Sequence, residues 1–102
     1  DYSHLEELLS SNSNCLISLM YGNNEIGNLL DIEKVSELAH KYKAFFHCDT
    51  VQAIGHYPID LSKLNVHFLA AAAHKFNGPK GVGFIYINRS VKIKPMLTGG
   101  AQ

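Results

Sequence analysis

The sequence predicts an α/β fold in which helices cover a mostly parallel sheet on both faces, giving three layers. Two observations predict it. Several apolar runs have the length of strands and little polar alternation, which is typical of strands covered on both faces. The first two runs are separated by a segment with helical periodicity, and strand, helix, strand is the order that makes neighbouring strands parallel. The 102 residues suffice for one small domain.

The first element expected is a short helix in DYSHLEELLSS, residues 1–11. Ser3 and Glu6 form a capping-box pattern there, and three leucines share one face. The apolar run CLISLMY, residues 15–21, follows as the first strand. The segment GNNEIGN, residues 22–28, is rich in turn residues and is predicted to be a loop.

Asp31 can cap a second helix, whose apolar positions recur at helical spacing up to Tyr42. Basic residues gather at the end of this helix, as the helix dipole favours. AFFHCDT, residues 44–50, is the second strand. The connection that follows contains Pro58 and a short helical turn.

Three further strands are expected towards the end of the chain. VHFLAAA is the third, at residues 66–72, and GVGFIYI is the fourth, at residues 81–87. VKIKPML, residues 91–97, is expected as a fifth strand at the edge of the sheet, because it contains Pro95.

Composition and charge exclude several classes. Nine basic and nine acidic residues cancel, so no positive field favours nucleic acid. No apolar run approaches the roughly 20 residues of a membrane span, and the first residues do not resemble a signal peptide. Cys15 and Cys48 lie in apolar runs and are expected to be reduced core residues of a cytosolic protein. No cysteine or histidine spacing indicates zinc, so we expect no metal site.

Polar residues follow each of the first three predicted strands. Ligands of open α/β sheets bind outside the carboxyl ends of the strands, so these residues form the candidate site. They are Asn23, Asn24 and Glu25, then Asp49, Thr50 and Gln52, then His74 and Lys75.

Each set also has a purely structural interpretation. Asn23 and Asn24 could be turn formers, Asp49 could cap a following turn, and His74 with Lys75 could be a solvated pair. The glycines after the lysine match neither a dinucleotide fingerprint nor a Walker-A loop.

Together the candidates match the needs of pyridoxal 5'-phosphate (PLP). This cofactor needs a lysine for its Schiff base and an acid facing the pyridine nitrogen. Lys75 and Asp49 can fill these roles, and Gln52 can donate to the ring oxygen. The lysine must also lose its proton to act as a nucleophile, which requires a partly desolvated pocket or a nearby positive charge.

The motifs NNEIG, HCDTVQAIG, PIDLSKL and AHKFNGPKGVGFIYI together resemble the cysteine desulfurases. These are PLP enzymes of fold type I in the class V aminotransferase superfamily. The resemblance covers residues 15–102, and its motifs occur in the family's order. It implies that residues 1–102 are a single segment of the large PLP-binding domain, with the small domain and the rest of the large domain lying elsewhere.

The resemblance also implies roles for individual residues. Lys75 is the Schiff-base lysine and moves protons during the reaction, and Asp49 pairs with the pyridinium nitrogen. Gln52 binds the phenolic oxygen, and Asn24 contacts the cofactor from the first loop. His74, beside the lysine, helps to hold the phosphate.

The function implied is removal of sulfur from L-cysteine, which leaves alanine and an enzyme persulfide for iron-sulfur assembly and sulfur transfer. A homodimer and sulfur-acceptor proteins are implied as partners, without nucleic acid or membrane, in the cytoplasm. The alternatives are another class V enzyme, such as a selenocysteine lyase, and an inert chain that acts by self-association through open sheet edges.

Two departures from the family pattern stand out. Ala72 occupies the position where the family usually has a phosphate-binding serine. The thiolate that accepts sulfur is expected outside these residues, since Cys15 and Cys48 are both predicted to lie in buried strands. We therefore expect the chain alone to be inactive.

Overall fold

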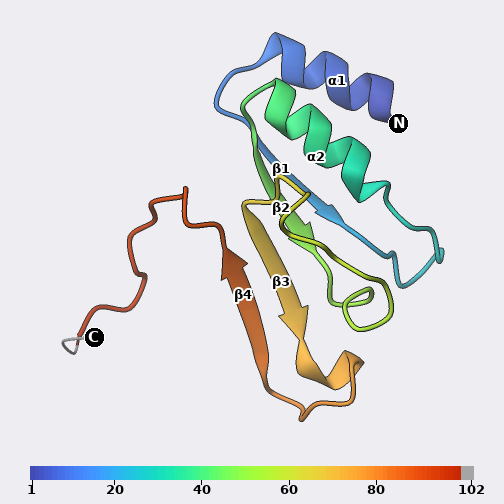
Figure 1. Cartoon of the computed structure of the whole chain (residues 1–102), viewed down its shortest axis with the longest axis vertical. Helices are drawn as coiled ribbons and strands as arrows, with labels where there is room; N and C mark the ends of the chain where they lie inside the picture. Colours follow the sequence, from blue (N-terminus) through green and yellow to red (C-terminus); the bar gives the residue numbers. More distant parts are fainter. Residues whose placement is uncertain (100–102) are drawn as a thin grey trace.

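The computed structural model describes residues 1–99, which form two α-helices packed on a four-stranded sheet (Figure 1). The elements are α1 (Tyr2–Ser11), β1 (Leu16–Met20), α2 (Ile32–Lys41), β2 (Phe45–Asp49), β3 (Phe68–Ala72), the 3₁₀ turn η1 (Ala73–Lys75) and β4 (Gly83–Ile87). Spatial order follows chain order, with β1, β2 and β3 parallel and β4 antiparallel. The predicted α/β class with a mostly parallel sheet is confirmed.

The register of the strands divides their side chains between two faces. We call the face that packs against α2 the covered face; it carries Phe46 and Cys48 of β2, with Ile17 and Leu69 beside them. We call the opposite one the open face, because alternate residues of a strand point to opposite sides. Its residues are Leu16, Ser18, Met20, Phe45, His47, Asp49, Phe68, Ala70, Ala72, Gly83, Ile85 and Ile87.

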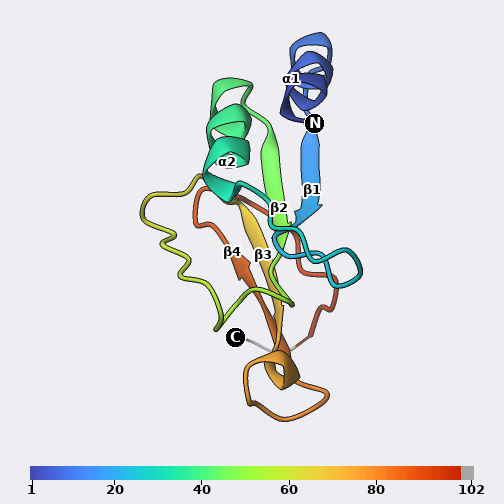
Figure 2. The same cartoon turned by 90° about the vertical axis from the view of Figure 1, so that its right-hand side faces the viewer.

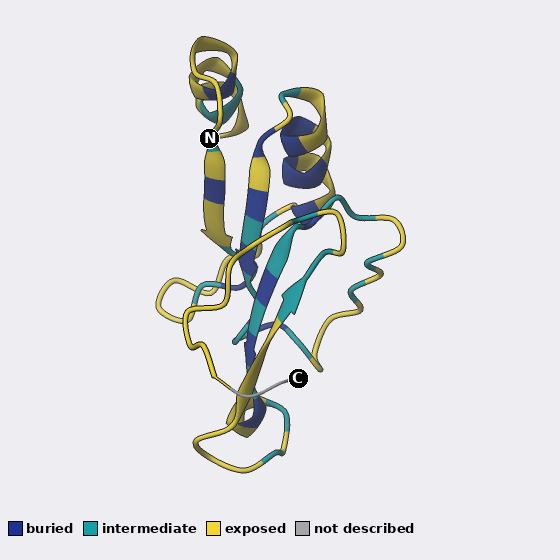
Figure 3. Ribbon diagram, turned by 90° about the vertical axis from the view of Figure 1, so that its left-hand side faces the viewer, coloured by how far each residue is buried: buried dark blue, intermediate teal, exposed yellow. Residues whose placement is uncertain are grey.

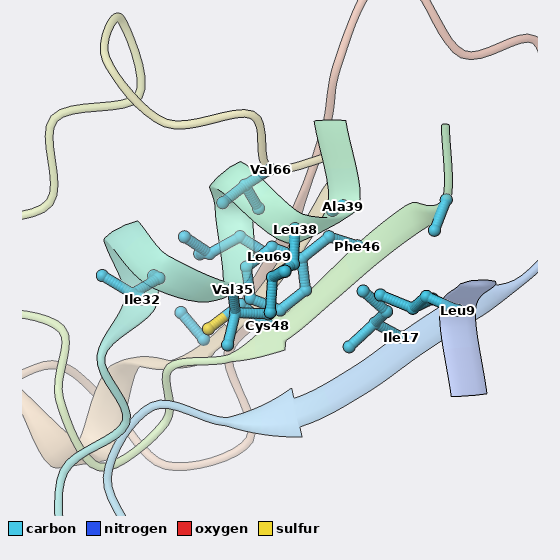
Figure 4. Packing of buried hydrophobic residues seen from close by; sticks show 12 residues of the cluster. Leu9, Ile17, Ile32, Val35, Leu38, Ala39, Phe46, Cys48, Val66 and Leu69 are labelled. Atoms are coloured by element: carbon cyan, nitrogen blue, oxygen red, sulfur yellow. The ribbon is translucent and has the colours of Figure 1, made fainter. Parts of the chain in front are cut away.

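The core lies between α2 and the covered face. Val35 and Ala39 of α2 are fully buried and belong to one cluster with Phe46 of β2 (Figure 4). The helix α1 packs beside α2 at the β1 edge, where its Leu9 lies next to Ile17 (Figure 4). In the turned view α2 lies to one side of the sheet, while β3 and β4 continue past the helices towards η1 (Figure 2).

The expected third layer is not formed by residues 1–99. On the open face Leu16 is 61% exposed, Phe45 46% and Ile85 58%. Burial is concentrated in α2, β2 and β3, whereas most of β1 and the first part of β4 are exposed (Figure 3). The strand runs are apolar on both faces, as the sequence indicates, but the described helices cover only one of them.

The start of α1 differs from the prediction. Asp1 is the N-cap, and its Oδ1 accepts hydrogen bonds from the amides of Ser3 at 2.9 Å and His4 at 3.3 Å. Ser3 therefore lies inside the helix, and the predicted capping box is wrong. Glu6 turns instead to α2, where its Oε1 lies 2.6 Å from Lys41 Nζ.

The start of α2 agrees with the prediction. Asp31 caps the helix, with its Oδ1 accepting from the amide of Lys34 at 2.9 Å. The helices α1 and α2 have ten residues each, and no helix within residues 1–99 is long and apolar enough to cross a membrane.

The predicted fifth strand is wrong. Residues 91–97 form no strand, and the chain leaves β4 as an extended, largely exposed segment (Figure 1). Met96 is 100% exposed and Leu97 91%. Pro95 has no amide hydrogen to donate to a ladder, and these apolar side chains find no surface to bury them.

Gly83 lies at the start of β4, opposite Ala72 of β3. A Cβ added there would lie 2.6 Å from the carbonyl oxygen of Ala71, which is backbone and cannot move aside cheaply. We expect Gly83→Ala to lower the free energy of unfolding by about 1–3 kcal/mol, the usual cost of overpacking, as measured by urea denaturation. Gly22→Ala is the control, since its Cβ would meet Leu29 at an ordinary 3.5 Å. Equal stability of the two variants would contradict the prediction.

Candidate functional site

The candidate residues gather at one edge of the sheet because β1, β2 and β3 are parallel. Their carboxyl ends lead into three loops, which are residues 21–31, 50–67 and the turn after β3 (Figure 1). All the predicted site residues belong to the ends of these strands or to these loops.

Asp49 is the last residue of β2 and lies on the open face, half-buried, beside Met20 and Ala70. Its Oδ1 accepts a hydrogen bond from the amide of Val51 at 3.0 Å, so Asp49 does cap the turn that follows. Its Oδ2 accepts no hydrogen bond within residues 1–99. One carboxylate oxygen thus stabilises the turn, and the other is available to a ligand.

Lys75 ends the turn η1 and is exposed, as is His74. The turn is held by two amides that donate to the carbonyl of Ala73, from Phe76 at 3.0 Å and from Gly78 at 2.8 Å. Among the described residues, Lys75 forms no ion pair. The turn therefore presents a primary amine at the edge of the sheet without a partner carboxylate in residues 1–99.

The register relates this amine to the carboxylate. Asp49 pairs with Ala70, and Ala72 is two residues further along β3 on the same face. Ala72 therefore lies about 7 Å beyond the level of Asp49, at the usual rise of a strand, and η1 begins directly after it. Ala72, where the resemblance implies a serine, is thus on the same face as Asp49, between it and the lysine turn.

Gln52 and Asn24 come from the other two loops. Gln52 is half-buried in the turn after β2, and its Cβ lies 3.7 Å from the position of a Cβ built on Gly22, so the two loops touch. Asn23 shapes the first loop, because its Oδ1 accepts from the amides of Glu25 and Ile26. Asn24 is exposed in that loop, so Asn23 is the turn former of the pair.

A groove among the described residues lies elsewhere. It has a volume of about 730 Å³ and runs between α2 and the segment from Pro58 to Asn65. The candidate residues instead line an open edge, so within residues 1–99 they offer one side of a site rather than an enclosed pocket.

Both cysteines are free thiols, and neither lies at this edge with an accessible sulfur. Cys48 is fully buried, and burial raises its pKa to about 12, so it stays an unreactive thiol at neutral pH. Cys15 differs from the prediction because it is half-buried and precedes β1. It lies at the opposite end of a five-residue strand, roughly 17 Å from the carboxyl edge.

Sequence reasoning missed a contact to the lysine turn. The Nε2 atom of His56 lies 3.2 Å from the carbonyl oxygen of Lys75. No spacing in the sequence indicates this contact, because the two residues meet only through the packing of two loops.

The comparisons with known proteins agree with this arrangement. The family model described as aminotransferase class-V matches residues 1–102. The chain belongs to the class-V aminotransferase family. Proteins of this family are PLP-dependent enzymes, and the resemblance found in the sequence is confirmed.

Similar proteins within this family are cysteine desulfurases. The chain is 53% identical over 87 residues to the cysteine desulfurase IscS of Methanosarcina thermophila, covering 85% of this chain and 22% of that relative. The NifS-like protein of Rickettsia africae has a TM-score of 0.85 and 38% identity, over 98% of this chain and 28% of that one. The structure of SspA in complex with cysteine has a TM-score of 0.86 and 31% identity, over 98% of this chain and 29% of that one.

The described residues fit the cofactor of this family. An exposed amine at Lys75 and a carboxylate oxygen of Asp49 without a hydrogen-bond partner reach the same edge from neighbouring parallel strands. A Schiff base and a protonated pyridine nitrogen need these two groups. Ala72 offers no hydroxyl to the phosphate, so the residues fit the phosphate less well than the serine that the resemblance implies would.

Proposed function

We propose that the chain is the lysine-bearing segment of the PLP-binding large domain of a cysteine desulfurase. The observation that carries the proposal is that Asp49, Gln52 and Lys75 all lie at or just beyond the carboxyl ends of the neighbouring parallel strands β2 and β3. The 53% identity to a cysteine desulfurase over 87 residues supports this activity among those of the class V family.

The cofactor supplies an electron sink, and the residues of the chain bind it and move protons. Lys75 would hold the cofactor covalently through Nζ, and the same amine would take up and return protons during the reaction. The oxygen of Asp49 that has no hydrogen-bond partner among residues 1–99 would keep a proton on the pyridine nitrogen, because a nearby negative charge favours the charged form. Gln52 would donate to the ring oxygen, His74 would help to hold the phosphate, and Asn24 would contact the cofactor from the first loop.

The substrate proposed is L-cysteine, which gives alanine and an enzyme persulfide for iron-sulfur assembly and sulfur transfer. The structure of SspA in complex with cysteine, at 31% identity, supports a cysteine substrate. Sulfur-acceptor proteins, a homodimer and a cytoplasmic location belong to the same proposal. Cys48 and Cys15 lack the exposure and the position of a sulfur-accepting thiolate, so we propose no such role for them.

The experiment that tests the proposal is addition of L-cysteine to the chain loaded with PLP. We expect a saturable change in the cofactor's absorption spectrum without sustained release of sulfide, because neither described cysteine can accept sulfur. L-Serine serves as the control, since it has the same amino and carboxylate groups without the sulfur. A spectrum that L-cysteine leaves unchanged would contradict the proposal.

A second candidate function is self-association, either alongside catalysis or in an inert chain. The exposed apolar side chains of the open face, such as Leu16, Phe45 and Ile85, favour it. The outer edges of β1 and β4 pair with no strand among residues 1–99, which leaves backbone groups free to pair with another chain.

Restoring the family's serine is expected to strengthen cofactor binding. A hydroxyl at position 72 would lie on the face of Asp49 directly before η1, and a hydrogen bond to a charged group is worth about 1.5–3 kcal/mol. Ala72→Ser should therefore lower the Kd for PLP roughly tenfold or more, measured by titration followed by absorbance. Ala70→Ser, on the same face but beside Asp49, should leave it unchanged. An equal Kd for Ala72→Ser and the parent chain would show that no phosphate group reaches this position.

A further inference from the structure

The loop after β2 makes a contact with the turn that carries Lys75. The Nε2 atom of His56 lies 3.2 Å from the carbonyl oxygen of Lys75. A carbonyl oxygen only accepts, so the imidazole is the donor, and either the neutral Nε2–H tautomer or the cation can make this bond. The two residues are 19 positions apart, so the bond ties together two separate loops.

A second contact joins the neighbours of these two residues, Gly55 and Phe76. Gly55 has φ +81°, and a Cβ built there would lie 2.8 Å from Cβ of Phe76. The backbone at Gly55 thus approaches the side chain of Phe76 more closely than a residue with a Cβ atom could. Phe76 is half-buried and packs against the core cluster. The loop therefore contacts both residues of the Lys75–Phe76 peptide.

This loop is itself firmly anchored. The amides of His56 and Tyr57 both donate to the carbonyl of Ala53, at 3.0 and 2.9 Å, and Ala53 is fully buried. The loop also follows directly from β2, whose last residue is Asp49. One segment therefore carries Asp49 and holds the backbone of Lys75.

We propose that His56 is a positioning residue for the proposed Schiff-base lysine. It acts through the Lys75 carbonyl and does not touch the cofactor. By holding the turn before the cofactor arrives, it lowers the conformational entropy that attachment would otherwise cost. The hydrogen bonds from Phe76 and Gly78 to Ala73 close the same turn, so we expect them to open more often when this restraint is removed. This inference rests on the proposed function for its catalytic meaning, whereas the restraint itself exists without the cofactor.

The test compares His56→Ala with His56→Gln, whose side-chain amide can donate in place of Nε2. The first readout is amide hydrogen exchange of Phe76 and Gly78 by NMR on the chain without PLP. The second is the rate at which PLP is lost from the loaded chain on dilution. His4→Ala, an exposed histidine of α1, is the matched control.

We expect His56→Ala to raise both rates about three- to tenfold, the usual net worth of one hydrogen bond, with recovery in His56→Gln and no change in His4→Ala. Unchanged exchange of the Phe76 and Gly78 amides in His56→Ala would overturn the proposal. Faster exchange with an unchanged rate of PLP loss would also overturn it, because His56 would then hold the turn without positioning the lysine. If the Lys75→Ala chain retains PLP as the parent chain does, it is the proposed function that fails.

Discussion

Replacing Lys75 by alanine is expected to abolish specific covalent attachment of PLP to the chain. Lys75, whose exposed amine lies at the end of η1, is the only lysine of this turn, and η1 directly follows the parallel strand β3. Borohydride reduction of the PLP-loaded chain, followed by mass spectrometry of its peptides, should place the cofactor on Lys75. The variant should show no adduct in that peptide and no yellow absorption, because alanine cannot form the imine bond.

The matched control for this experiment is Lys80→Ala. Lys80 is also exposed and lies five residues further along the same loop. Surface lysines react weakly with any aldehyde, so a general reaction would label both positions alike. Retention of the adduct in Lys80→Ala and its loss in Lys75→Ala identifies the attachment point. Equal labelling of the two variants would remove the lysine from the proposed site.

Replacing Asp49 by asparagine is expected to weaken PLP binding roughly 10- to 100-fold, since the variant loses a hydrogen bond between charged groups worth about 1.5–3 kcal/mol. Asparagine keeps an Oδ1 that can accept from the amide of Val51, so the turn after β2 should survive. It removes the negative charge that holds a proton on the pyridine nitrogen. The Kd for PLP, measured by titration, should rise while the urea midpoint of unfolding stays within error.

Asp60→Asn controls for the loss of one negative charge. Asp60 is exposed, lines the groove beside α2 and pairs with Lys63 at 3.3 Å. Ser62 and Lys63 hold its pKa below the usual range, so it is fully ionised at neutral pH and its replacement changes net charge as Asp49→Asn does. A similar Kd for the two variants would mean that Asp49 has no special role in binding the cofactor.

The sequence by itself determined four strands and the edge at which the candidate site lies. Four of the five predicted apolar runs became β1, β2, β3 and β4, whereas residues 91–97 formed no strand. Asp31 caps α2 as predicted, since capping depends on residues three apart in the chain. The parallel order of the first strands then brings Asp49 and Lys75 to one edge, which follows from topology alone.

The tertiary structure decided what depends on contacts between distant residues. The sequence pattern suggested Ser3 as a cap, but Asp1 caps α1, because its carboxylate accepts from the amides of Ser3 and His4. Glu6 forms an ion pair with Lys41 of α2 instead. Which face of the sheet is covered depends on where the helices pack. The sequence of a strand that is apolar on both sides does not indicate which face that is. The bond from His56 to Lys75 joins loops 19 residues apart, so only the folded chain shows what holds the lysine in place.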